Sequence, residues 1–202
     1  FRLHGPSTSH AASMSATGIQ VFAVSENVRS GIVIQNNELS GWSHAAIKVY
    51  GQYAATPAPT MASSQADQVL ITRNYFHHNV MDHTGYGVHV GRGSYASIRG
   101  NVFDYNRHAV SSDGEPHGGY IARYNYVLEG GHCEDGAVFC FYNQHFDVHG
   151  NDGGDGGVGG EYFVITQNTI RGDQSYGVGF MTRPAFQLRG EPTIGAYFHN
   201  NV

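Results

Sequence analysis

The sequence predicts an all-β protein built of stacked coils, a solenoid, and three observations lead to this prediction. Glycine supplies 28 of the 202 residues while charged residues make up only 13%, a balance that disfavours a helical bundle. Hydrophobic residues reach 40%, with 13 tyrosines and 11 phenylalanines, which is enough apolar area to bury a core and argues against disorder. The third observation is a short pattern that recurs along the chain. We therefore expect a single domain over residues 1–202.

The recurring pattern is centred on asparagine. Each copy has an apolar or small residue, two variable residues, asparagine, another variable residue and an apolar one, as in residues 71–76. The shortest separation between successive asparagines is 24 residues, from Asn101 to Asn125. Unequal spacing above such a minimum is typical of β coils whose loops have grown on one side. The asparagines expected to line one corner are Asn37, Asn74, Asn101, Asn125, Asn168 and Asn200.

Short alternating segments lie between these asparagines and are expected to be strands. Residues 46–50, 87–91 and 177–181 place apolar side chains on one face at a period of two. Asparagine suits the bend between strands because it tolerates left-handed backbone angles, and stacked amides can hydrogen-bond along a ladder. We expect about six to eight coils, with insertions near 52–68 and 129–160 and almost no helix.

Both ends of the sequence look open. Val202 directly follows an asparagine bend, and no amphipathic helix precedes Phe1. An open solenoid end exposes strand edges and core. We therefore expect the coils to be incomplete at both ends, or covered there by another chain.

These repeats resemble a right-handed parallel β-helix of the type found in pectate-lyase-like and NosD-like secreted proteins. Three segments, Arg107–Pro116, Tyr120–Asn125 and His145–Gly150, are similar to a recurrent subgroup of such proteins from environmental sequences. The resemblance implies the fold and export to an extracellular or periplasmic location, but no particular reaction. The sequence also lacks a motif for the arginine- and proline-containing calcium site of pectate lyases.

The chain contains two cysteines, Cys133 and Cys140, which are seven positions apart. Two thiols alone do not make a zinc site, and the chain has no CxxC motif. Their spacing allows either a disulfide or two buried thiols. The export that the resemblance implies favours the disulfide.

Charge restricts the partners of this protein. The net charge of −5 leaves no electrostatic footprint for nucleic acid. No apolar run approaches the ~20 residues of a membrane span. Among the 11 basic residues Lys48 is the only lysine, and the arginines carry a planar fork that suits carboxylates and sulfates. This bias favours an anionic ligand.

The strongest candidate site is the segment that contains His145, Asp147 and His149. On a strand these three side chains project from one face while the two apolar residues between them enter the core. Neighbours on that face are ~6.5–7 Å apart, so one ion would need a bend, or a further ligand such as His108 or His132 from another coil. The set suits either a transition metal or acid–base chemistry with the carboxylate orienting a histidine. The alternative is a polar face of hydrogen-bonded histidines.

Arg107 and His108 open an expected strand of an earlier coil. Because parallel coils stack ~4.8 Å apart, these residues can share a groove with the candidate segment. Such a groove has the parts of a polysaccharide lyase, in which Arg107 or Arg183 neutralises a uronate carboxylate and a histidine removes the adjacent proton. A glycosidase would instead pair Glu115 with Asp147 as its two carboxylates.

Two further features predict binding more weakly. Tyr105 and Tyr142 can stack on sugar rings, or simply pack on the coils. Asp152 and Asp155 lie in a glycine-rich segment that could bind a divalent ion such as calcium, although its spacing matches neither an EF-hand nor a nonapeptide repeat. The alternative for this segment is a flexible insertion loop.

Together these observations predict an extracellular carbohydrate-active protein that cleaves or binds a polysaccharide, with an acidic glycan favoured. Lyase chemistry is slightly preferred over hydrolysis. Two other functions stay open: a structural or adhesive protein whose coils stack end to end into filaments, and a periplasmic metal-handling protein. The only cofactor that the sequence suggests is a divalent metal, calcium or a transition metal.

Overall fold

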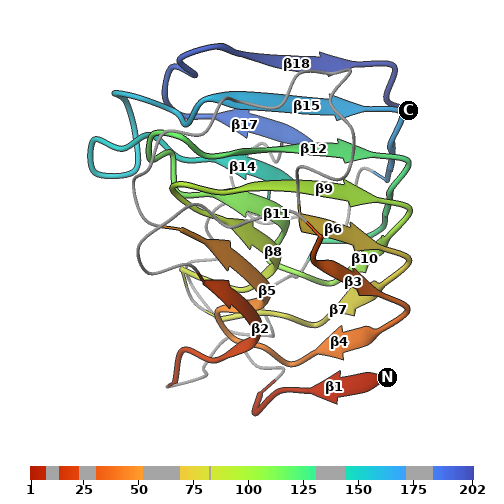
Figure 1. The fold of residues 1–202 in the computed structure, drawn as a ribbon. Helices are drawn as coiled ribbons and strands as arrows, with labels where there is room; N and C mark the ends of the chain where they lie inside the picture. The colour runs from red at the N-terminus through yellow and green to blue at the C-terminus, as the bar shows by residue number, and fades with distance from the viewer. Residues whose placement is uncertain (8–13, 23–30, 52–68, 82, 131–143, 172–183) are drawn as a thin grey trace, which may run out of the picture.

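The chain folds as a right-handed parallel β-helix, shown by a computed structural model (Figure 1). The structure describes residues 1–7, 14–22, 31–51, 69–81, 83–130, 144–171 and 184–202. These residues form three parallel sheets of six strands each, one strand per coil, and include no helix. Consequently the described part of the chain has no helix long and apolar enough to cross a membrane. The predicted fold class is confirmed, with six coils at the lower end of the expected number.

The three sheets are named A, B and C. Sheet A contains β1 (Arg2–His4), β4 (Glu38–Ser40), β7 (Tyr75–His77), β10 (Val102–Asp104), β13 (Tyr126–Val127) and β16 (Thr169–Ile170). Sheet B contains β2 (Thr17–Phe22), β5 (Ala45–Tyr50), β8 (Tyr86–Val90), β11 (His108–Ser112), β14 (Phe146–Val148) and β17 (Phe186–Leu188). Sheet C contains β3 (Val33–Gln35), β6 (Val69–Thr72), β9 (Tyr95–Arg99), β12 (Gly119–Arg123), β15 (Tyr162–Thr166) and β18 (Gly195–His199).

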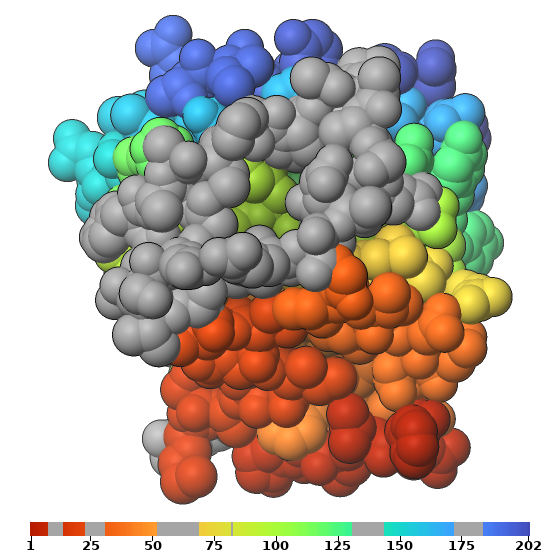
Figure 2. Space-filling view, in the orientation of Figure 1, coloured from red at the N-terminus to blue at the C-terminus, as the bar shows by residue number. Residues whose placement is uncertain are grey.

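The chain passes from sheet C to sheet A to sheet B in every coil, so each strand pairs with the strand three places along the sequence. The coils stack in chain order from β1 at one end to β18 at the other (Figure 1), and the space-filling surface shows the same order as bands from red to blue (Figure 2). This stacking brings residues far apart in sequence onto one face, which is what a site assembled from several coils requires.

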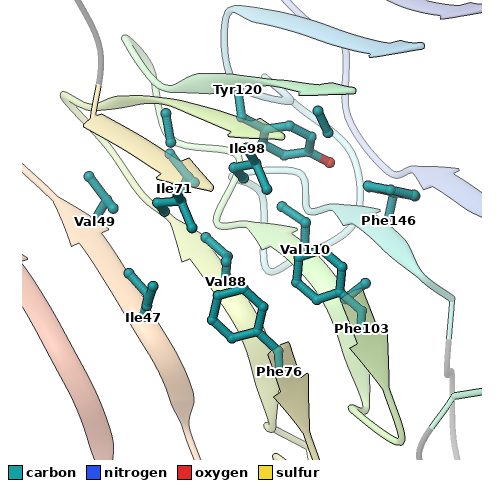
Figure 3. Close-up of a cluster of buried hydrophobic side chains, with 14 of the residues drawn as sticks. Ile47, Val49, Ile71, Phe76, Val88, Ile98, Phe103, Val110, Tyr120 and Phe146 are labelled. Carbon is teal, nitrogen blue, oxygen red and sulfur yellow. The ribbon is translucent and has the colours of Figure 1, made fainter. Parts of the chain in front are cut away.

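The core lies inside the coils and draws on all three sheets. Phe76 and Phe103 of sheet A stack with ring centroids 4.9 Å apart. Val88 of sheet B and Ile98 of sheet C face the same interior (Figure 3). These side chains are almost fully buried, and full burial of each contributes about 1.5–3 kcal/mol to folding.

The asparagine ladder runs along the corner between sheets C and A, as predicted. In each step the side-chain oxygen of one asparagine accepts from the backbone and the side-chain N–H of the preceding one, at 3.0 and 3.1 Å between Asn101 and Asn125. The sixth member is Asn201, and the prediction of Asn200 is wrong. The register pairs Phe198 with Ile165, so the last copy of the pattern begins one residue later than expected.

The left-handed residue of this corner is not the ladder asparagine. It is the residue before it, with φ of 54° at Arg73, 58° at Tyr124 and 55° at Asn200. The prediction that asparagine itself adopts this conformation is therefore wrong. The ladder asparagine is fixed by its neighbours, because its backbone N–H and both side-chain groups bond to adjacent coils, and the preceding residue makes the reversal.

A second asparagine ladder, of only two residues among those described, lies at the corner between sheets A and B. The side-chain N–H of Asn79 donates to the side-chain oxygen of Asn106 over 2.7 Å. Each is again preceded by a left-handed residue, His78 with φ 52° and Tyr105 with φ 49°. The same corner geometry is thus used twice in these coils.

Some of the sequence predictions fall outside the residues that the structure describes. These are the disulfide between Cys133 and Cys140, the candidate ligand His132, the site residues Arg183 and Tyr142, the strand at 177–181, the insertion at 52–68, and part of the insertion at 129–160.

Candidate functional site

The outer face of sheet B carries the candidate site. β14 alternates as predicted, because Phe146 and Val148 belong to the core and Asp147 between them faces away from it. The register places Asp147 beside Ser111 of β11 and Gln187 of β17. Since neighbouring strands are ~4.8 Å apart, side chains from three coils meet around this carboxylate.

Asp147 is fully buried and surrounded by hydrogen-bond donors. Arg189 donates twice, from Nε to Oδ1 over 3.1 Å and from Nη2 to Oδ2 over 2.6 Å. His149 donates from Nε2 to Oδ2 over 2.7 Å. Burial on its own would raise the pKa of Asp147, but the bonds from His149 and Arg189 outweigh burial and hold that pKa well below its usual range. Asp147 is therefore ionised at neutral pH.

His108 lies next to this carboxylate as a neutral imidazole. Its Nδ1 donates to the carbonyl oxygen of Gln144 over 2.6 Å. Its Nε2 accepts from Nη1 of Arg107 over 2.7 Å, because a guanidinium can only donate. Burial, reinforced by the charge of Arg107, lowers the pKa of His108 to about 3. The 3.5 Å approach of His108 Nε2 to Asp147 is therefore not an ion pair.

His149 is the partly exposed member of this group, with 29% of its side chain accessible. Its Nε2–H is engaged by Asp147, so Nδ1 is the ring atom left to exchange a proton. The glycine-rich turn that follows β14 borders this atom, because a Cβ built on Gly154 would lie 3.8 Å from it. Gly154 also has a φ of +98°, which favours glycine. The turn thus passes close to Nδ1 of His149, and Gly154, which borders this atom, has no side chain.

Positive charge exceeds negative charge in the buried part of the site. Arg107 and Arg189 are two guanidinium groups, and Asp147 is the one fully buried carboxylate between them. Asp155 is the second described carboxylate near Arg189, 3.3 Å from Nη1, and it is 78% exposed. Such a surplus favours an anionic ligand.

Aromatic and imidazole rings extend the site along sheet B. The Tyr86 ring stacks on His108 with centroids 5.4 Å apart and on His89 at 5.3 Å. His89 lies in the same row as Asp147 and contacts Ser111 Oγ through Nδ1 at 2.8 Å. Burial lowers the pKa of His89 well below its usual range. A continuous row of polar groups and rings therefore crosses the coils next to Asp147.

The same row continues to the only lysine of the chain. Lys48 pairs in register with His89, and burial lowers the pKa of this lysine. His44 beside it has a pKa of about 4, lowered by burial and by the charge of Lys48. The row thus begins with a cation at Lys48 and ends with the Asp147 cluster. This cluster consists of the five side chains that meet at that carboxylate: Arg107, His108, Asp147, His149 and Arg189.

The structure brings together four of the predicted catalytic residues, Arg107, His108, Asp147 and His149. The fifth, His145, is buried one residue before β14, where its carbonyl oxygen accepts from the backbone N–H of Val110 over 3.0 Å.

The two predicted substrate-binding residues that the structure describes make contacts elsewhere. Glu115 follows β11, and its backbone N–H donates to Asp113 over 3.1 Å. Tyr105 lies at the corner after β10, where its ring stacks on His78 and its hydroxyl donates to Glu129 over 2.6 Å.

The predicted calcium residues lie in the turn after His149. The backbone N–H of Asp155 donates to the carbonyl of Asp152 over 3.3 Å, and the Asp155 carboxylate faces Arg189. Among the described residues, no group of three or more His, Cys, Asp or Glu side chains is arranged to hold a metal ion. Metal binding by Asp152 and Asp155 stays a prediction.

Arg189 is the main site residue that the sequence analysis missed. A signal for it exists, because residues 146–150 read Phe-Asp-Val-His-Gly and residues 186–190 read Phe-Gln-Leu-Arg-Gly. Aligning these two segments predicts the observed register, with Val148 beside Leu188, and places Arg189 one coil beyond His149.

Comparisons of the sequence with family models and with curated proteins, and of the fold with solved structures, found no match. The function must therefore be argued from the site itself.

Proposed function

We propose that this protein is a secreted member of the pectate-lyase-like and NosD-like β-helix proteins that binds an acidic polysaccharide on sheet B and cleaves it by β-elimination. One observation carries the proposal: ionised Asp147 holds His149 by Nε2–H, and the opposite ring nitrogen of His149 faces the glycine turn at the surface. A carboxylate-oriented histidine of this kind is suited to act as a general base.

The chemistry follows from the acidity of the carbon next to a uronate carboxylate. His149 Nδ1 takes the proton from C5, the C–H electrons form the C4–C5 double bond, and the C4–O bond to the next sugar breaks. The departing oxygen takes a proton from water, and the hydroxide that remains is neutralised by the proton that the His149 imidazolium then releases. Asp147 stabilises the imidazolium that forms, and the charge of Arg189 or Arg107 stabilises the negative charge that develops on the substrate carboxylate.

Hydrolysis through Asp147 fits the geometry less well. A glycosidase needs two carboxyl groups that contact the sugar, one of which carries a proton or attacks the anomeric carbon. Asp147 is fully buried, and both of its oxygens are bonded to Arg189 or His149. Such a carboxylate orients a base rather than reacting itself.

The row from Lys48 to Asp147 supports a polymer as the substrate. Lys48, His89, Ser111 and Asp147 follow one another in register on β5, β8, β11 and β14. Ser111 and Asp147 are buried, and the accessible groups are Lys48 and His89 at one end and His149 at the other. With strands ~4.8 Å apart, β5 and β14 are separated by about 14 Å, which is long enough for several sugar residues. A cation at the far end would bind a second carboxylate of an acidic chain.

The test is a panel of acidic and neutral polysaccharides, each incubated with the protein with and without a chelator. We expect the ultraviolet absorbance of an unsaturated uronate to rise with an acidic polymer, and the rise to be lost in His149→Ala. His199→Ala on sheet C is the matched control and should keep full activity. Absence of both cleavage and binding on every polymer would refute the proposal, and light scattering against concentration would then test the filament alternative.

A further inference from the structure

A second cluster of histidines lies on sheet A, on a different sheet from the proposed polysaccharide site. His77 ends β7, and His78 follows it at the corner to sheet B. Adjacent residues on a strand normally point to opposite faces. Here the left-handed backbone of His78, with φ 52°, turns its side chain so that the two rings meet. Their Nδ1 atoms are 3.0 Å apart.

The tautomer of His77 is fixed by a carboxylate. Nε2 of His77 is 3.3 Å from Oε1 of Glu38, and a carboxylate can only accept, so this nitrogen carries the proton. Arg2 holds the other oxygen of Glu38 through Nε at 2.9 Å. The Nδ1 of His77 therefore presents a lone pair toward His78. A carboxylate behind the distal nitrogen is the arrangement that orients metal-binding histidines.

Both rings are clamped by tyrosines. Tyr75 stacks on His77 with centroids 4.5 Å apart, and Tyr105 stacks on His78 at 5.0 Å. Each tyrosine is itself held, because the Tyr75 hydroxyl donates to Asp104 over 3.2 Å and the Tyr105 hydroxyl donates to a glutamate on the next coil. The two imidazoles are thus held next to each other before any ligand arrives, and an ion that binds both Nδ1 atoms lies to one side of the line that joins them.

We propose that His77 and His78 form a binding site for a divalent transition metal of the copper–nickel type. Imidazole nitrogens bind such metals at ~2.0–2.1 Å, so two donors 3.0 Å apart subtend roughly 90–95° at the ion. This angle matches the tetragonal preference of copper(II) and nickel(II), whereas tetrahedral zinc would require the nitrogens to separate to about 3.4 Å. Water molecules complete the coordination.

Metal binding needs one proton to move. In the metal-free pair the proton between the rings belongs to Nδ1 of His78, because His77 uses its own on Glu38. When the metal binds both Nδ1 atoms, that proton moves to Nε2 of His78, so the ring stays a neutral imidazole. No oxidation or reduction is involved.

The experiment is a calorimetric titration of the full chain with copper(II) chloride, read together with electron paramagnetic resonance. We expect His77→Ala and His78→Ala each to abolish one copper site that the wild type has, and the spectrum of that site to show coupling to two imidazole nitrogens. Glu38→Gln should weaken this site by about 10–100-fold while keeping both ligands. His199→Ala, a histidine on sheet C, is the control and should leave it unchanged.

Circular dichroism of each variant shows whether the coils are intact, which separates loss of the site from loss of the fold. Should either histidine prove difficult to replace with alanine, His78→Gln tests the same site without an empty corner. Equal copper binding by the wild type and these variants would overturn the proposal and leave a hydrogen-bonded histidine pair only. Tighter binding of zinc than of copper would overturn the geometric argument.

Discussion

Two groups of buried polar residues in this solenoid, the asparagine ladder and the Asp147 cluster, differ in their composition. The asparagine ladder repeats one neutral residue in every coil, and each of its four inner amides bonds to an identical amide above and below. The Asp147 cluster occurs once and joins a carboxylate, two imidazoles and two guanidinium groups from three coils. The inner amides of the ladder find their partners in one another and in backbone carbonyls. The Asp147 cluster leaves His149 and Arg189 partly exposed at the surface.

This difference teaches how to separate structure from function in a repeat protein. A polar residue that recurs at one position satisfies its neighbour in the next coil, so it stabilises the stack and requires no ligand. A buried polar group that occurs in only one coil has no identical neighbour, so its hydrogen bonds must come from other residue types. Natural sequences keep such exceptions to the repeat mainly at functional sites.

The largest effect on stability is expected from the ladder. Asn101→Ala removes the acceptor of the Asn74 backbone N–H and leaves that group buried without a partner. We expect a loss of about 3–5 kcal/mol in the free energy of unfolding, measured by urea denaturation. Asn37→Ala is the matched control, because Asn37 is half-buried at the start of the ladder, and it should cost only about 1 kcal/mol.

A slightly smaller loss is expected at Asp147. Asp147→Asn keeps the size of the side chain but removes the charge that Arg189 and His149 face, and we expect a loss of about 2–3 kcal/mol. Asp155→Asn alters the exposed partner of the same Arg189 and should cost less than about 0.5 kcal/mol. Equal losses in the two variants would show that burial of the Asp147 charge has no special weight.

Acid should destabilise the site through His108. Its folded pKa of about 3 lies below the ordinary value of 6.5, so between these values the unfolded chain binds more protons than the folded one. Stability is therefore complete above about pH 6.5 and falls by up to about 1.4 kcal/mol per pH unit as pH decreases toward 3. His108→Gln, which does not titrate, should show a flatter profile in urea unfolding at several pH values. An unchanged slope would contradict a buried neutral histidine.

Asp147 adds to this effect at lower pH. Its folded pKa is depressed, so its contribution is present above the ordinary value near 3.9 and is lost only as pH falls further. The acid limb of the wild type should therefore have two parts, and Asp147→Asn should remove the lower one.

A smaller effect on stability is expected at His149. This partly exposed residue fills no core position, and Arg189 bonds both oxygens of Asp147 without it, so His149→Ala should lower the free energy of unfolding by only about 1 kcal/mol. Activity should nevertheless be lost. A large loss of stability instead would assign His149 to the structural group, together with the ladder.

Much of the fold could be predicted because its signals are local and repeated. The spacing of the asparagines was enough to predict the ladder. The prediction was wrong only in the last coil, because Asn200 and Asn201 are adjacent and both nearly fit the pattern. The positions of the left-handed residues were not predicted, because many residue types occupy them, as at Arg73 and Tyr124.

The candidate site was predicted only in part, for physical reasons. His108, Asp147 and His149 could be grouped because alternation on strands sets which side chains share a face. Arg189 lies a further coil along, beyond a long connection, and becomes visible only when two similar segments are aligned. The contact between His77 and His78 depends on the left-handed backbone angle of His78 at a corner. The alternation of side chains along a strand does not predict such an angle.

We propose that His149, oriented by Asp147, removes a proton from a uronate, and the mass of the products tests this role most directly. An acidic oligosaccharide of defined length is incubated with the wild type, with His149→Ala and with His199→Ala, and the products are weighed by mass spectrometry. Elimination predicts two fragments whose masses sum to that of the substrate, formed by the wild type and His199→Ala but not by His149→Ala. Fragments that have gained one water molecule, or cleavage that persists in His149→Ala, would contradict the account.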